Sequence, residues 1–113
     1  MKYYYSLRID GDSDLIRDKI CLILNEESNM QYQTWGLEKI IDTNDTYVNY
    51  IDYFLKILKG KFDLLENIGI VKSDITIWML YEYENQCNME FEATDLKNLG
   101  DNGIKLCISC WKK

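Results

Sequence analysis

The chain contains no histidine and no proline, and its apolar runs are short. Without histidine it lacks the residue that enzymes use most often as a general base and that metals bind most often. The run at residues 20–24 is far too short to span a bilayer, and the first residues lack the apolar core of a signal peptide. We therefore expect a soluble, cytoplasmic protein with no membrane partner.

Positive charge is also scarce, with 13 lysines and arginines against 19 acidic residues and a formal charge of −6. A protein that binds nucleic acid needs clustered basic residues for the phosphates, so we expect no nucleic-acid partner. An acidic surface speeds the encounter with a basic protein. The alternative is that the charge only keeps a small domain soluble.

Four cysteines are present, and in the cytoplasm we expect them to be free thiols. Cys107 and Cys110 have the C-x-x-C spacing of redox and zinc sites. They lie in a predicted strand, however, where residues three apart point to opposite faces. A zinc site would also need two further ligands, and no second close pair is available. The sequence therefore predicts neither a metal nor a cofactor.

Catalytic patterns are equally thin. Residues 10–14, with aspartate at every second position, have a superficial similarity to a calcium loop. The glycine comes second, however, and Cys21 stands at the twelfth position, where the loop needs glutamate. A turn after a strand, followed by a helix N-cap, is the better interpretation. Pairs of glutamates on strands could hold a hard cation, as in metal-dependent hydrolases, but an open sheet face provides no cleft that excludes water. We expect no catalytic residues and no enzyme activity.

The length suits one domain over residues 1–113. Apolar periodicity predicts strands at residues 2–10, 31–41, 75–84, 87–93 and 104–111. It predicts helices at 13–25 and 45–59, a helical turn within 62–68, and a short helix through Leu96 and Leu99. The order of strand, helix, strand, helix, strand, strand, helix, strand indicates an α+β fold. We expect a mixed, mainly antiparallel sheet of about five strands with two to three helices packed on one face.

Residues 75–93 have the pattern of a hairpin, in which alternate side chains lie on opposite faces. Pairing Tyr81 with Phe91, and Tyr83 with Met89, places the tyrosines and methionines on the core face. The opposite face, joined by the last strand, then carries the residues that we expect to bind a partner: Trp78, Leu80, Glu82, Glu84, Glu90, Glu92 and Trp111.

The same alternation places Tyr4, Arg8 and Lys105 on that face. Aromatic residues rimmed by charge are typical of protein-contact surfaces. The alternative is that a loop or residues 60–69 cover the two tryptophans and leave only solvated glutamates.

Several segments together resemble an uncharacterised, mainly bacterial family known as domain of unknown function 4279. They are the opening strand at residues 5–12, Trp35, the amphipathic helix at 47–58, and the closing unit at 91–108. The resemblance implies a small, stand-alone α+β domain. The family has no agreed active site, so it assigns a role to no residue. Proteins of this family are similar in size and in their occurrence as single domains to immunity proteins that neutralise bacterial toxins.

These observations favour a non-catalytic protein-binding domain, in the form of an immunity protein that presents an acidic and aromatic sheet face to a basic partner. Self-association through the same face is a further possibility for the partner. The alternative function is a small-ligand-binding or regulatory domain, whose pocket would lie between sheet and helices and be lined by Tyr81, Tyr83 and Phe54.

Overall fold

The computed structural model describes residues 2–30, 34–42 and 48–113. The elements follow in the order β1 (Lys2–Asp10), α1 (Asp14–Leu24), β2 (Thr34–Asp42), α2 (Tyr50–Leu58), α3 (Phe62–Asn67), the 3₁₀ turn η1 (Lys72–Asp74), β3 (Ile75–Tyr83), α4 (Ala93–Asp101) and β4 (Lys105–Lys112). The α+β class is confirmed. The predicted strand start at 31–33 and the predicted helix start at 45–47 lie outside the described residues.

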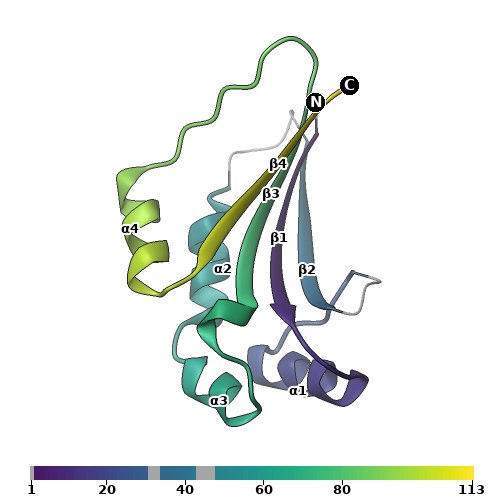
Figure 1. The fold of residues 1–113 in the computed structure, drawn as a ribbon, viewed down its shortest axis with the longest axis vertical. Coiled ribbons are helices and arrows are strands. Elements are labelled where there is room, and N and C mark those ends of the chain that lie inside the picture. Colours follow the sequence, from purple (N-terminus) through teal and green to yellow (C-terminus); the bar gives the residue numbers. More distant parts are fainter. Residues whose placement is uncertain (1, 31–33, 43–47) are drawn as a thin grey trace.

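The four described strands form one sheet in the order β2-β1-β3-β4. Strand β1 pairs antiparallel with both β2 and β3, whereas β3 and β4 run parallel. The sheet is therefore mixed and mainly antiparallel, as predicted, but it has four described strands where we expected about five. Figure 1 shows the strands side by side, with both chain ends at the same end of the sheet.

The predicted hairpin is wrong, because residues 84–92 form no strand. Both edges of β3 are already occupied: Tyr81 lies opposite Tyr3 of β1 and opposite Cys110 of β4. Neither Phe91 nor Met89 can then pair with this strand. A parallel neighbour needs a crossover connection, and residues 84–92 followed by α4 supply it (Figure 1).

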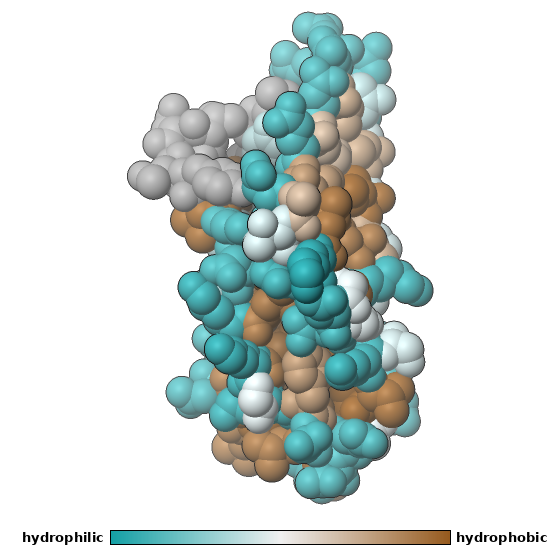
Figure 2. Space-filling model, turned by 90° about the vertical axis from the view of Figure 1, so that its left-hand side faces the viewer, coloured by the Kyte–Doolittle hydropathy of each residue, from teal (hydrophilic) through white to brown (hydrophobic). Residues whose placement is uncertain are grey.

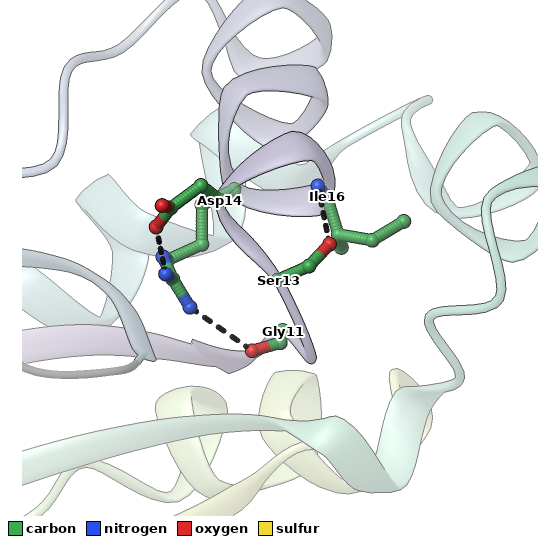
Figure 3. Close-up of polar contacts among 5 residues, drawn as sticks. Gly11, Ser13, Asp14 and Ile16 are labelled. Carbon is green, nitrogen blue, oxygen red and sulfur yellow. Dashed lines mark hydrogen bonds and ion pairs between the residues drawn. The ribbon is translucent and has the colours of Figure 1, made fainter.

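The start of α1 confirms the interpretation of residues 10–14 as a turn and a cap. Strand β1 ends at Asp10, and the Ser13 hydroxyl accepts the backbone N–H of Ile16 at 3.3 Å. The Arg17 guanidinium pairs with Asp14 and donates to the Gly11 carbonyl at 3.3 Å (Figure 3). One side chain caps the helix while another ties it back to the end of β1, so the local sequence fixes this corner.

Strand β3 has the predicted alternation. Ile75, Ile77, Met79 and Tyr81 are buried, and the residues between them are half-buried. Ile75 and Ile77 join a single core with side chains from all four α-helices, among them Ile20, Phe54, Leu65 and Leu99. The helices therefore cover one face of the sheet.

Helices α2 and α4 are joined by a polar contact. Asn49 caps α2 by accepting the N–H of Asp52 at 3.1 Å, and its amide donates to both carboxylate oxygens of the buried Asp95 at 3.0 and 3.1 Å. Asp95 lies in the first turn of α4 and faces the cap of α2.

The free edge of β2 is covered by the chain that precedes it. The Asn29 side chain accepts the N–H of Glu38 at 2.7 Å and donates to its carbonyl at 2.9 Å. The Ser28 hydroxyl makes the equivalent pair of hydrogen bonds with Gly36, at 3.0 and 2.9 Å. These contacts occupy groups with which another strand would pair, so they protect this edge against association.

Candidate functional site

The face of the sheet turned away from the helices carries most of the predicted contact residues. We call it the outer face; it includes Tyr4, Trp78, Leu80 and Trp111. Tyr4 lies between Ile40 of β2 and Leu80 of β3, and Leu80 lies beside Ser109 of β4. One row of side chains thus crosses all four strands. Register fixes this row, because neighbouring residues in paired strands project to the same side.

One half of the outer face is rich in hydrophobic side chains. Its hydrophobic residues, which we call the apolar rows, are Ile40, Tyr4, Leu80, Trp78 and Trp111. Ile40 is 56% exposed and Trp111 is 39% exposed. The other three side chains are half-buried. In the part of the chain that the structure describes, the helices pack on the opposite face, so these side chains meet solvent.

The predicted acidic cluster is only partly assembled. Glu82 lies beside Trp111 in the register, and the exposed Glu84 follows β3 with its carboxylate 3.9 Å from the ammonium group of Lys113. Glu90 and Glu92 are exposed but belong to the crossover segment, not to the sheet. Their placement on the outer face was wrong, because it depended on the hairpin. The face is therefore less acidic than the sequence suggested.

Trp78 is held in place by its neighbours. The Arg8 guanidinium lies over its ring at 4.6 Å from the centroid, and the indole N–H donates to the Thr76 hydroxyl at 3.1 Å. Arg8 Nε also donates to the hydroxyl of Ser6 at 3.1 Å, which leaves Ser6 fully buried on this face. Arg8 and Trp78 therefore cover the middle of the sheet. Neither side chain can change its rotamer without losing these contacts.

The other half of the outer face is polar and hollowed. A cleft of about 320 Å³, which we call the lower cleft, crosses all four strands. It is lined by Arg8, Asp10, Met30, Thr34, Thr76, Trp78, Lys105 and Cys107. A larger cleft of about 400 Å³ lies between α2 and α4. Its Lys56 is already paired with Asp52 at 2.9 Å.

Cys110 faces the helix side of the sheet, whereas Cys107 lines the lower cleft. The two cysteines of the C-x-x-C spacing are therefore on opposite faces, as expected. The sequence did not reveal that the sulfur of Cys110 lies 3.5 Å from the sulfur of Cys87 in the crossover segment. Burial, together with the contact to Cys110, raises the pKa of the Cys87 thiol.

Two tyrosines stack beside these thiols. The rings of Tyr3 and Tyr81 are 4.5 Å apart, and their hydroxyls share a hydrogen bond of 3.3 Å. This bond and burial raise the pKa of Tyr81 to about 12. Of the residues proposed to line a pocket between sheet and helices, Tyr81 is buried here and Phe54 is fully buried against Tyr50 and Tyr53.

Exposed apolar residues also occur away from the outer face. Leu96 of α4 is 49% exposed, and Ile108 of β4, whose side chain is turned to the helix side, is 43% exposed. Figure 2 looks at the side of the molecule that carries α4 and shows hydrophobic surface among hydrophilic residues there. Single exposed apolar side chains are ordinary. The apolar rows differ because the register makes three of their residues, Ile40, Tyr4 and Leu80, direct neighbours.

Within the described ranges, no three histidine, cysteine or acidic side chains are grouped so as to hold a metal ion. No described helix is both long and apolar enough to cross a membrane. Comparisons with family models, with curated proteins and with solved structures give no match.

Proposed function

We propose that this chain is a non-catalytic protein-binding domain that contacts another protein through the apolar rows of its outer face. The observation that supports this proposal is the run of neighbouring apolar side chains Ile40, Tyr4 and Leu80 across three strands, on the side away from the described helices. Adjacent apolar residues bordered by charge are typical of contact surfaces. Tryptophan and tyrosine, the types found at positions 111 and 4, are enriched among residues that dominate binding energy.

The charge of the chain favours a basic partner. Its formal charge is −6, and Glu38 and Glu82 lie among the apolar rows. Opposite net charges speed association and align the partners. A cytoplasmic immunity protein that neutralises a basic bacterial toxin is the specific form of the proposal that the size and acidity of the chain favour.

The test compares two leucines. A photo-reactive amino acid replaces Leu80 on the outer face or Leu64, which is 47% exposed on α3, and each variant is irradiated in cells that make the protein. We expect a discrete adduct from position 80 and none from position 64. The adducted protein, once purified, is then titrated against the wild type and against Leu80→Glu and Leu64→Glu.

Leu80→Glu is expected to weaken binding at least about tenfold, since it places a charge in the middle of the contact. Leu64→Glu makes the same chemical change elsewhere and is expected to bind as the wild type does. Trp111→Ala, at an exposed site near the end of β4, is also expected to weaken binding. This result does not depend on the stability of the Leu80 variant. Equal affinity of all variants would refute the proposal. The isolated protein could also sediment as a dimer that Leu80→Glu dissociates. That result would mean that the partner on this face is a second copy of the chain and not a different protein.

A further inference from the structure

We propose that the lower cleft is a binding site for a small ligand that carries one carboxylate group. The cleft lies on the polar half of the outer face, away from Ile40 and Leu80, and brings together side chains from all four strands. It includes two cations, Arg8 and Lys105. This inference does not rest on the protein-binding proposal: Trp78 borders both sites, but the cations and hydroxyl groups that would hold the ligand lie outside the apolar rows.

Both cations are available to a ligand. Among the described residues, neither Arg8 nor Lys105 takes part in an ion pair. The Nε of Arg8 is occupied by Ser6 and the plane of its guanidinium rests on Trp78, which orients the group and leaves its two terminal nitrogens for other contacts. A planar guanidinium with two donors matches the two oxygens of a carboxylate.

Thr76 adds a hydrogen-bond donor to the cleft. The Thr76 hydroxyl accepts the indole N–H of Trp78 at 3.1 Å, so its own hydrogen can be donated. Thr76 lies between Arg8 and Lys105 in the register. A carboxylate at this point can therefore receive hydrogen bonds from three neighbouring strands.

The net charge of the cleft favours a monoanion. The two cations are opposed by the carboxylate of Asp10, which Thr34 contacts at 3.4 Å. One positive charge remains in excess. A phosphate dianion would bring a second negative charge close to Asp10, and like charges at short range repel each other. This balance distinguishes a carboxylate from a phosphate.

The apolar walls indicate the rest of the ligand. Met30 packs directly on Gly36, where an added Cβ would lie 2.4 Å from the methionine sulfur. Met30, Trp78 and Cys107 line the cleft together with the polar groups. At about 320 Å³ the cleft is at the small end of ligand sites, so a compact acid with one ring fits it.

The experiment titrates the ¹⁵N-labelled protein with sodium benzoate and follows the indole N–H signal of Trp78, assigned with Trp78→Phe. Benzamide, the neutral analogue of benzoate, and inorganic phosphate are titrated in parallel at constant ionic strength. We expect a saturable shift with benzoate, and no saturable shift with benzamide. Lys105→Gln is expected to weaken benzoate binding about threefold to tenfold. Lys112→Gln, which makes the same change on the same strand outside the cleft, is expected to leave it unchanged.

Arg8→Lys serves as a second variant, because it keeps the charge but loses the two-donor fork, and it too is expected to weaken benzoate binding. A benzoate shift that never saturates would overturn the proposal. So would equal binding of benzamide, tighter binding of phosphate, or an equal effect of Lys105→Gln and Lys112→Gln. None of these results bears on binding of a protein to the apolar rows, which Leu80→Glu tests separately.

Discussion

The openness of the outer face can be tested by two substitutions in the same strand. Ile77 and Leu80 both lie in β3, Ile77 fully buried on the helix side and Leu80 half-buried on the outer face. Changing either residue to alanine removes three carbon atoms and lowers the β-propensity. The two variants therefore differ mainly in the surroundings of the deleted atoms.

The expected losses of stability differ severalfold. At about 0.8 kcal/mol for each buried methylene, Ile77→Ala forfeits about 2.4 kcal/mol of transfer free energy. The cavity left between sheet and helices adds about 1 kcal/mol, for a total of about 3–4 kcal/mol. Leu80→Ala removes atoms that are already partly in water and leaves no closed cavity, so its loss is about 1 kcal/mol.

Urea denaturation followed by circular dichroism measures both losses as differences in the free energy of unfolding. Equal losses of about 3 kcal/mol would refute the reasoning, because Leu80 would then be packed inside the molecule. A small loss for Ile77→Ala together with a large one for Leu80→Ala would mean that the helices cover the other face.

Three further predictions follow from contacts away from the outer face. Because the pKa of Tyr81 is raised from 10.0 to about 12, the folded state keeps a proton that the unfolded chain releases. Stability is expected to fall as the pH rises from about 10 through 12, and Tyr81→Phe is expected to reduce this fall in guanidinium titrations at each pH. Diamide is expected to oxidise Cys87 and Cys110 to a disulfide, since their sulfurs need to close only from 3.5 Å to about 2.0 Å; peptide mass spectrometry without reductant detects the bridge. Asn29→Ala removes two hydrogen bonds to the edge of β2 and is expected to cost about 1–2 kcal/mol in urea denaturation.

Each of these predictions has a matched control. Tyr4→Phe removes a hydroxyl outside the stacked pair, and an equal flattening of the alkaline fall by both variants would remove Tyr81 as its cause. A bridge from Cys107 to Cys110 in the folded protein would contradict the placement of these residues on opposite faces. Asn67→Ala changes an exposed asparagine at the end of α3; a loss equal to that of Asn29→Ala would show that the edge contacts of β2 add nothing.

The alternation of side chains within single elements was readable from the sequence, but the partners of the strands were not. The bounds of β1 and the inward set of β3 follow from period-two patterns. Residues 87–93 show the same pattern, with the half-buried Met89 and Phe91 at alternate positions, yet they make no strand. An extended segment with alternate side chains turned inward gives the same signal as a strand. The pairing of β3 with β1 and β4 excludes the segment from the hairpin that the sequence predicted.

The sites that depend on strand order were missed for the same reason. Alternation placed Arg8 and Lys105 on the outer face, but their approach to one cleft requires that β1, β3 and β4 be neighbours in this order. The contact of Cys87 with Cys110 likewise depends on the crossover returning over β4. Charged and hydroxyl residues of one parity near the same end of several strands were the available signal for the cleft.

The most direct measurement is relaxation of methyl signals by a soluble gadolinium chelate, first in the free protein and then with the captured partner. We predict strong relaxation of the Ile40 and Leu80 methyl groups in the free protein, little for Ile77, and protection of Ile40 and Leu80 once the partner is bound. Two results would contradict a contact surface on this side of the sheet. In one, the Leu80 methyl groups of the free protein are as protected as those of Ile77; in the other, they stay as exposed in the complex as they are in the free protein.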